Sequence, residues 1–404
     1  MGELVGIEQI QTARELAKGV WVETPLEYSR VLSDASGGPV YLKCENLQRT
    51  GSFKIRGAYT MIHGLSDQEK AAGVVAASAG NHAQGVALAA TTLGVKSTVF
   101  MPEGASIPKV AATKRYGADA VLAGRVYDEA YSAAVEFSKK SGAVMVHPFD
   151  HPDVIAGQGT VALEILEQLP DVASIVVPIG GGGLISGIAA AAKALKPDIV
   201  VIGVEPMGAA NVSLGLEKGE PVDLDEVSTF ADALAAKRSG AVTLEHVKKF
   251  VDEIVTVTDD EIAEALLLMV ERAKLVVEPG GATGVAVVLT GRAVLPKPSV
   301  VVASGGNIDP LLLLKVLRFG MGSAGRYFAF RTRVKDAPGS LHRLLGVVAE
   351  EGGNVVGVEH HREGASVRHL FEVEIAVQVE TGGHDHVRDI KAKLYAAGYA
   401  VEDL

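Results

Sequence analysis

Lys54 is the residue of this chain best placed to do covalent chemistry, because it lies between a predicted strand and a predicted helix. The strand-like run 40–44 is followed by turn and cap residues at 50–52, and a helix is predicted to begin near Phe53. At a helix N-terminus and partly out of water, the helix dipole and desolvation both lower the pKa of an ammonium group. A lysine amine of lowered pKa forms Schiff bases, which makes Lys54 a candidate for covalent catalysis. A surface lysine at a helix start is the structural alternative, and this residue taken alone does not exclude it.

A first loop that could bind an anion follows the strand-like run 74–77 and precedes an alanine-rich helix predicted over 83–93. Backbone amides at such a helix start, together with an asparagine side chain, can hold a carboxylate group. A simple capped turn is the structural alternative, since serine and asparagine favour this position in any helix. The loop consists of Ser78, Ala79, Gly80, Asn81 and His82.

A second loop joins the strand-like run 174–178 to a helix predicted over 185–195. It is made of Gly180, Gly181, Gly182, Gly183 and Leu184. Consecutive glycines let the backbone approach a phosphate group closely, and the helix dipole favours the phosphate charge. The loop has neither the glycine spacing of dinucleotide-binding loops nor the Lys-Ser/Thr pair of P-loops, so the sequence predicts a phosphate other than that of NAD or ATP.

A third candidate group is Ser304, in the Ser-Gly-Gly-Asn segment 304–307 at the end of an apolar strand. Its hydroxyl could hydrogen-bond an aromatic ring nitrogen, whereas an aspartate there would keep that nitrogen protonated. A Schiff-base lysine, a phosphate-binding loop and a neutral ring partner together describe a site for pyridoxal 5'-phosphate.

The composition limits what such a site could serve. The 404 residues are 48% hydrophobic and 22% charged, which is ordinary for a globular enzyme of two or three domains. The net charge of −11, without a basic run, disfavours nucleic acid and anionic membranes as partners. Cys44 is the single cysteine, so a disulfide or a thiolate metal cluster within one chain is excluded, and a reducing cytoplasm is predicted. Neither a signal peptide pattern nor an apolar run of about 18 residues is present.

Short β-branched runs alternate with helical segments along most of the chain, which is typical of parallel strands joined by crossover helices. The first helix is predicted over 7–18 and is followed by an irregular arm at 24–26. Further strands are predicted at 97–101, 120–122, 143–147, 200–205, 251–257 and 299–303. The pattern predicts an α/β fold with two open parallel-sheet halves, and ligands collect between such halves.

Four segments resemble, in order and spacing, the threonine dehydratases (threonine ammonia-lyases), which are fold-type II pyridoxal phosphate enzymes. The segments are GSFKIRGA at 51–58, SAGNHAQG at 78–85, PIGGGGLISG at 178–187 and SGGN at 304–307. The resemblance covers nearly the whole chain to about residue 320. It implies a catalytic domain over 1–320, similar to the β subunit of tryptophan synthase, in which a smaller α/β subdomain at about 45–150 is inserted.

The resemblance also implies a role for each site residue. Lys54 would bind pyridoxal phosphate as a Schiff base and act as the base at the substrate Cα, and Phe53 would pack against the pyridine ring. Asn81 would hydrogen-bond the phenolic oxygen of the cofactor, and Ser304 would bond the ring nitrogen. The phosphate would be held by Gly180, Gly181, Gly182, Gly183 and Leu184. The substrate carboxylate would be bound by Ser78, Ala79, Gly80, Asn81 and His82.

The activity implied by the resemblance is α,β-elimination, which converts L-threonine to 2-oxobutanoate and ammonia, or L-serine to pyruvate and ammonia. A hydroxyl partner leaves the pyridine ring largely neutral, so loss of the β-hydroxyl is favoured over a long-lived carbanion. An L-serine dehydratase or a serine racemase is the nearest alternative. Serine racemases carry a second base, a serine, where Ala79 stands here, and Phe149 also fits the dehydratase pattern better.

Some relatives bind a divalent cation through a Glu-Pro segment that resembles Glu205-Pro206, with an acidic residue further along. Asn211 occupies that later position in this chain, so we expect a weakened or absent metal site, with no metal ligands predicted, and a structural or solvated role for Glu205. Two other classes of protein agree less well with these motifs. A nicotinamide oxidoreductase would need the dinucleotide fingerprint. An amino-acid-binding sensor with a vestigial catalytic half would be expected to have lost Lys54.

The chain changes character after a short glycine-rich linker predicted at 321–325. Residues 326–404 show a βαββαβ order with an alternating sheet face, which predicts a ferredoxin-like fold. The Asp-x-Pro-Gly-x-Leu turn at 336–341 makes this region resemble an ACT domain. ACT domains commonly pair between chains and bind amino acids near that turn. We therefore expect a homodimer or homotetramer, and an effector such as isoleucine or valine near Pro338 and Gly339.

Overall fold

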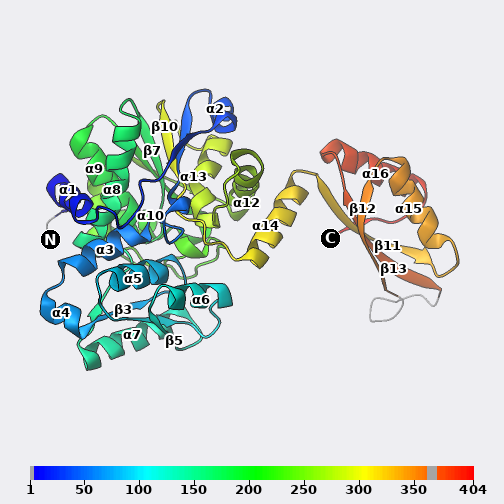
Figure 1. Ribbon diagram of the computed structural model, residues 1–404. Coiled ribbons are helices and arrows are strands. Elements are labelled where there is room, and N and C mark those ends of the chain that lie inside the picture. The colour runs from blue at the N-terminus through cyan, green and yellow to red at the C-terminus, as the bar shows by residue number, and fades with distance from the viewer. Residues whose placement is uncertain (1–3, 362–370) are drawn as a thin grey trace. The chain divides into compact units, whose positions relative to one another are not determined.

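The computed structural model describes residues 4–361 and 371–404 and divides the chain into two compact units, Met1–Pro310 and Leu311–Leu404 (Figure 1). Helix α14 (Pro310–Ser323) begins at this division and includes residues 321–323, which the sequence predicted as linker. Glycines 320 and 322 are accommodated near the end of the helix, and the first left-handed glycine after it is Gly325, with φ 64°. The glycine-rich segment is therefore helical until Ser323.

The first unit contains two sheets and the helices that cover them. Its strands are β1 (Leu26–Tyr28), β2 (Val40–Lys43), β3 (Val74–Ala77), β4 (Ser97–Met101), β5 (Asp119–Leu122), β6 (Val144–Met145), β7 (Ser174–Pro178), β8 (Val200–Pro206), β9 (Glu253–Val257) and β10 (Ser299–Val302). Its principal helices are α1 (Ile7–Leu16), α2 (Arg30–Ser36), α3 (Lys54–Gly64), α4 (Asp67–Ala72), α5 (Asn81–Thr92), α6 (Ile107–Arg115), α7 (Tyr127–Ser141), α8 (Pro152–Gln168), α9 (Gly183–Leu195), α10 (Asn211–Lys218), α11 (Ala241–Phe250), α12 (Asp259–Leu268) and α13 (Pro279–Thr290).

The large sheet has the strand order β1-β2-β10-β7-β8-β9, and all its neighbours are parallel except the antiparallel pair β1 and β2. Ile175 and Val177 of β7 pack into the core that includes α8 and α9. Val176 points to the other face, where a Cβ on Gly284 of α13 would lie 3.3 Å from its Cγ1 atom. Helices therefore cover both faces, which explains why these strands are continuous apolar runs.

The small sheet, β5-β4-β3-β6, is parallel throughout. Figure 1 shows it between α5 and α6 on one face and α7 on the other. The alanines of α5 pack on Val99 and Met101 of β4, and those of α7 pack on Phe100. The predicted fold class, an α/β protein with two parallel-sheet halves, is confirmed.

Two sequence-based assignments in this unit are wrong. Residues 26–28, at the predicted irregular arm, form the edge strand β1, where Leu26 pairs with Lys43 and Tyr28 with Tyr41. A three-residue strand is too short to show a period in the sequence. The strand predicted over 143–147 is reduced to Val144–Met145, because the chain then turns towards Lys54 through residues 147–150.

The second unit has the antiparallel sheet order β12-β13-β11-β14, formed by β11 (Tyr327–Lys335), β12 (Asn354–His361), β13 (Glu372–Glu380) and β14 (Glu402–Asp403). Helices α15 (Ser340–Glu350) and α16 (His384–Ala396) pack on the apolar side chains of this sheet. The predicted ferredoxin-like arrangement is confirmed. The last strand lies at 402–403 and not at 399–401, because Tyr399 and Val401 pack against the core as the chain approaches the sheet.

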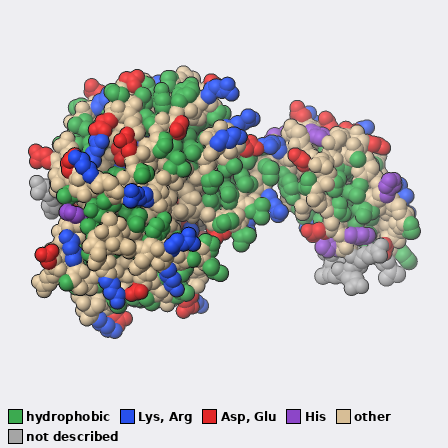
Figure 2. All heavy atoms as spheres, viewed as in Figure 1, with side chains coloured by type: hydrophobic (Ala, Val, Ile, Leu, Met, Phe, Trp, Pro, Cys, Tyr) green, Lys and Arg blue, Asp and Glu red, His purple; other side chains and the backbone are tan. Residues whose placement is uncertain are grey.

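The surface carries mixed charge in both units. Figure 2 shows Lys and Arg side chains interspersed with Asp and Glu over the visible face. Among the helices of residues 4–361 and 371–404, none has the length and apolar character needed to cross a lipid bilayer.

Candidate active site

Lys54 is the first residue of α3, as the sequence predicted, and its side chain is half-buried. Its Nζ atom donates a hydrogen bond of 2.6 Å to the carbonyl oxygen of Pro148 and lies 5.2 Å from the centre of the Phe53 ring. Desolvation lowers the pKa of Lys54 to about 8, although the Glu278 carboxylate opposes this shift. Near neutral pH the Lys54 amine is therefore still mostly charged, but its uncharged, nucleophilic form is far more abundant than that of an ordinary lysine.

The segment that carries Lys54 is joined by backbone hydrogen bonds to the segment that carries Ser304. Ser52 and Gly305 form an isolated β-bridge, and Phe53 N–H donates to the Ser304 carbonyl at 3.2 Å. Two predicted motifs about 250 residues apart thus form one structural unit beside α3.

Asn81, the first residue of α5, is held from two sides. Asn307 Nδ2 donates to Asn81 Oδ1 at 2.7 Å, and Asn81 Nδ2 donates to Glu278 Oε1 at 2.5 Å. These contacts fix which end of the amide carries its N–H groups. The second N–H of Asn81 has no protein acceptor in the part of the chain that the structure describes, so it is available to a ligand.

The predicted carboxylate-binding loop, 78–82, connects β3 to α5. The Ser78 hydroxyl accepts a hydrogen bond from Gly80 N–H at 3.1 Å, so it stabilises the turn of the loop. The His82 ring is buried and bonds the Val146 carbonyl through Nε2 at 2.8 Å. Burial lowers the pKa of His82 to about 3, helped by the charge of Lys54. His82 is consequently a neutral imidazole that donates to the backbone.

The glycine loop 180–184 lies between β7 and α9, and each of its glycines faces protein atoms. A Cβ at Gly181 would lie 2.3 Å from Phe149 Cε1, and one at Gly183 would lie 2.8 Å from Phe149 Cβ. Gly182 has φ 92° and packs on Thr243, whose hydroxyl donates to the Gly181 carbonyl at 2.8 Å. The run of glycines thus serves close packing against Phe149 and Thr243.

Replacing Gly181 by alanine is expected to destabilise the chain by about 1–3 kcal/mol, because the new methyl group overlaps the Phe149 ring. The midpoint of urea unfolding measures this loss. Gly104→Ala is the control, since a Cβ there meets nothing within 4 Å. The double change Gly181→Ala with Phe149→Ala should restore part of the loss relative to the sum of the single changes, and strict additivity would contradict the contact.

The residues present fit pyridoxal phosphate. The Ser52 hydroxyl next to Lys54 is buried and has no hydrogen-bond partner in the described chain, as expected for a group that awaits a ligand. The N–H groups at the start of α9 have no carbonyl one turn earlier within the helix, so they can receive a phosphate. Ser304 is buried, with 3% of the residue exposed.

The Glu205 carboxylate is fully occupied by helix α10. Its Oε1 accepts from Val212 N–H at 2.8 Å, and its Oε2 accepts from the N–H and the hydroxyl of Ser213 at 3.0 and 2.6 Å. Burial raises the pKa of Glu205, and these hydrogen bonds oppose the rise. Asn211 donates to the Gly180 carbonyl at 2.9 Å. These contacts support the structural role expected of Glu205.

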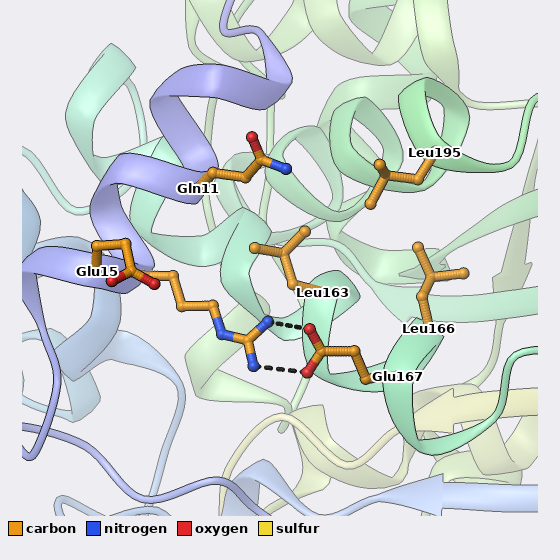
Figure 3. Close-up of a pocket in the computed structure, with 7 residues that line it drawn as sticks. Gln11, Glu15, Leu163, Leu166, Glu167 and Leu195 are labelled. Carbon is orange, nitrogen blue, oxygen red and sulfur yellow. Dashed lines mark hydrogen bonds and ion pairs between the residues drawn. The ribbon is translucent and has the colours of Figure 1, made fainter.

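A separate surface pocket of about 360 Å³ lies among α1, α8 and α9. Arg14, which lines the pocket, donates to Glu167 Oε2 at 2.6 Å. Figure 3 shows Glu167 together with Leu163, Leu166 and Leu195 around the pocket. None of its lining residues belongs to the four predicted motifs, so it is distinct from the site around Lys54.

Two contributors to the site were not foreseen from the sequence. Pro148 supplies the carbonyl that holds Lys54, and a backbone acceptor leaves no trace in residue type. Glu278 supplies a buried carboxylate against Asn81. A signal for Glu278 was available in the sequence, because this glutamate directly precedes a proline within an apolar stretch, where a carboxylate has no obvious structural purpose.

Comparison with known proteins shows the family to which the chain belongs. Residues 18–305 match the family model of the pyridoxal-phosphate dependent enzymes, and residues 329–398 match that of the ACT domain. An L-threonine ammonia-lyase of Thermotoga maritima is 48% identical over 98% of this chain and 99% of its own. The processed form of threonine deaminase isoform 2 from Solanum lycopersicum has a TM-score of 0.74 and 38% identity over 78% of this chain and 95% of its own.

Maize serine racemase shares the same fold, with a TM-score of 0.74 and 34% identity over 80% of this chain and 99% of its own. The fold alone therefore does not separate elimination from racemisation. Three findings together decide the family. One family model matches most of the first unit, a second matches most of the second unit, and an L-threonine ammonia-lyase is 48% identical over 98% of this chain. The chain belongs to the pyridoxal-phosphate dependent enzymes, among the L-threonine ammonia-lyases that carry a C-terminal ACT domain.

Proposed function

We propose that this chain converts L-threonine to 2-oxobutanoate and ammonia, that it also converts L-serine to pyruvate and ammonia, and that it does so in the cytoplasm. The observation that carries the proposal is Lys54, half-buried at the start of α3 with a pKa lowered to about 8. The names of the full-length relatives support threonine as the substrate.

When bound, the cofactor would draw electrons from the substrate Cα, so that the Cα–H bond weakens. The Lys54 amine would then accept the Cα proton at Nζ, the Cβ–O bond would break, and a Cα–Cβ double bond would form. The β-hydroxyl would leave with one proton as water, which balances the proton taken from Cα. Transfer of a proton from nitrogen to Cβ would convert the enamine to the imine. Water added at C2 releases ammonia and leaves the 2-oxo acid. Residues 78–82 would hold the substrate carboxylate at the start of α5, and residues 180–184 with Ser304 would hold the cofactor.

Purified protein supplied with pyridoxal phosphate should form a 2-oxo acid from L-threonine and, more slowly, from L-serine. A coupled assay that reduces the 2-oxo acid measures one product, and an ammonia assay measures the other. The two products should form in equal amounts from either amino acid. A protein that takes up the cofactor yet forms no 2-oxo acid from either amino acid would contradict the proposal.

Racemisation of serine is the second candidate, because maize serine racemase has the same fold. It requires a proton donor on the face of the substrate opposite Lys54, and Ala79 in the carboxylate-binding loop supplies none. Chiral analysis of the serine left after partial reaction tests this directly. Accumulation of D-serine at a rate comparable to pyruvate formation would favour the racemase.

The ACT region, 326–404, is proposed to bind an amino-acid effector such as isoleucine or valine at the turn containing Pro338 and Gly339. Gly339 has φ 86° and ends the turn that leads into α15. The guanidinium of Arg343 lies beside it, since a Cβ on Gly339 would be 3.2 Å from Arg343 Nη1. The free N–H groups at a helix N-terminus, together with an adjacent arginine side chain, can bind the carboxylate of an amino acid.

Gly339→Val in the full chain is expected to weaken the response of the activity to isoleucine or valine by about tenfold or more in effector concentration, because valine resists this left-handed backbone. Gly346→Ala in α15 is the matched control, since a Cβ there meets no atom within 4 Å. If Gly339→Val responds to isoleucine or valine at the same concentration as the parent, the effector site does not include this turn.

Assembly of the chain into a homodimer or homotetramer is proposed from the edge of the second sheet. Strand β12 lies at that edge, and its Val356 and Val358 are 52% and 36% exposed. An open strand edge with apolar side chains is suited to pairing with another copy. Light scattering of the full chain measures the mass, and a monomer at micromolar concentration would contradict pairing.

A further inference from the structure

Glu278 is a buried carboxylate that belongs to none of the four predicted motifs. It precedes α13, its side chain is 3% exposed, and its Oε1 atom accepts the hydrogen bond from Asn81 Nδ2. Its own N–H donates to the Gly305 carbonyl at 3.0 Å, which fixes its backbone to the segment that carries Ser304. The carboxylate therefore lies where α5, α13 and the end of β10 meet.

The position of Glu278 is unfavourable for the helix that it precedes. It occupies the N-cap of α13, where Ser, Thr, Asp and Asn are preferred, and its side chain makes no capping hydrogen bond. A buried carboxylate also carries a desolvation cost. Because the carboxylate is directed at Asn81 and not at the helix start, local stability does not account for a glutamate here.

The surrounding backbone is shaped to admit this carboxylate. A Cβ at Gly305 would lie 2.2 Å from Glu278 Oε1 and 3.1 Å from Asn81 Nδ2. A Cβ at Gly281 would lie 2.6 Å from the Gly305 carbonyl oxygen, so α13 also approaches this segment closely. The first glycine of the Ser-Gly-Gly-Asn motif thus makes the room in which Glu278 and Asn81 meet.

Charged groups from several elements act on Glu278. Burial raises its pKa to about 7, Asp232 adds to the rise, and the Asn81 hydrogen bond, Lys109 and Lys54 oppose it. In the other direction, Glu278 favours the charged form of Lys54. Two more groups face Lys54, namely His82 and His147, and both are neutral because burial lowers their pKa values to about 3 and 4.

We propose that Glu278 is a positioning residue, which orients the Asn81 amide towards the ligand of Lys54 and sets the proton affinity of the Lys54 amine. The hydrogen bond to Oε1 uses one N–H of Asn81 and so presents the other to the phenolic oxygen that the cofactor would place there. The negative charge of Glu278 favours the protonated form of Lys54. This inference rests on the proposed function for its catalytic consequence only.

The test uses Glu278→Gln, which keeps an oxygen for Asn81 and removes the charge, and Glu278→Ala, which removes both. The first readout is the pH dependence of amine labelling at Lys54 in the cofactor-free protein, followed by mass spectrometry of the Lys54 peptide. Both variants should shift the labelling midpoint to lower pH by roughly one unit, since a nearby negative charge is lost. This readout needs no activity, so it stands even if threonine is not the substrate.

The second readout is the affinity for pyridoxal phosphate, measured by its absorption on titration. Glu278→Ala should lose about tenfold in affinity or more, whereas Glu278→Gln should lose much less, because only alanine leaves Asn81 without its acceptor. Glu205→Gln is the matched control, because Glu205, like Glu278, is a buried glutamate, but its carboxylate caps α10. The proposal would be overturned if the labelling midpoint of Lys54 were unchanged in both Glu278 variants and if both variants bound pyridoxal phosphate as tightly as the parent and the control.

Discussion

Replacement of Lys54 by alanine is expected to reduce 2-oxobutanoate formation from L-threonine by at least about 10³-fold, because both the covalent attachment and the base at Cα are removed. The side chain is placed for this chemistry by the Pro148 carbonyl and by its position at the start of α3. Coupled detection of the 2-oxo acid measures the rate. The visible absorption of the cofactor-loaded protein should change at the same time, since the Schiff base with the protein can no longer form.

Lys54→Arg and Lys96→Ala complete this experiment. Arginine keeps a positive charge but cannot form the Schiff base, so Lys54→Arg should be as inactive as alanine. Lys96 is a surface lysine whose side chain is 76% exposed in its pair with Asp119, and its removal should leave the rate unchanged. Activity in Lys54→Ala within tenfold of the parent would mean that another amine does this chemistry.

Replacement of Arg56 by methionine is expected to destabilise the first unit by about 3–5 kcal/mol, because it leaves buried carboxylates without their main partner. Arg56 is fully buried, two residues after Lys54, and pairs with Glu45 at 2.7 Å and with Glu164 at 2.6 Å. Burial alone would raise the pKa of Glu164, but Arg56 and Lys43 hold it below its ordinary value. Without Arg56, Lys43 alone remains paired with Glu164, at 2.6 Å.

The urea midpoint of the full chain, followed by the fluorescence of the single Trp21, measures this effect, because the Arg56 guanidinium lies 5.3 Å from the Trp21 ring. Arg14→Met is the matched control. Arg14 forms an exposed pair with Glu167, and such pairs contribute about 0–1 kcal/mol. If Arg56→Met unfolds at the same urea concentration as Arg14→Met and the parent, the buried ion pairs of Arg56 do not contribute the expected stability.

Much of the architecture was predictable from the sequence because it depends on local periodicity. Strands β3, β4 and β7 have the predicted bounds, since a short apolar run between turn residues is consistent with a buried parallel strand and is too short for a helix. The helix that carries Lys54 begins next to the predicted residue. The alternating pattern of β13 likewise indicated a sheet with one covered face.

The residues proposed to do chemistry were selected by type and spacing, because a lysine at a helix start, a run of glycines before a helix and a serine after a strand occur together in this order. What the sequence left open was how these segments meet. The bridge between Ser52 and Gly305 and the hydrogen bond from Asn307 to Asn81 join residues more than 200 positions apart. Such pairings depend on the whole fold and have no local signal.

By itself, the sequence determined the fold class, the two-part organisation and the lysine at the centre of the site. Only the tertiary structure decided which groups surround that lysine: the Pro148 carbonyl, the neutral His82 ring and the Glu278 carboxylate. The physical reason is that secondary structure follows from interactions a few residues apart, whereas proton affinity follows from burial and from charges that packing brings within a few ångströms.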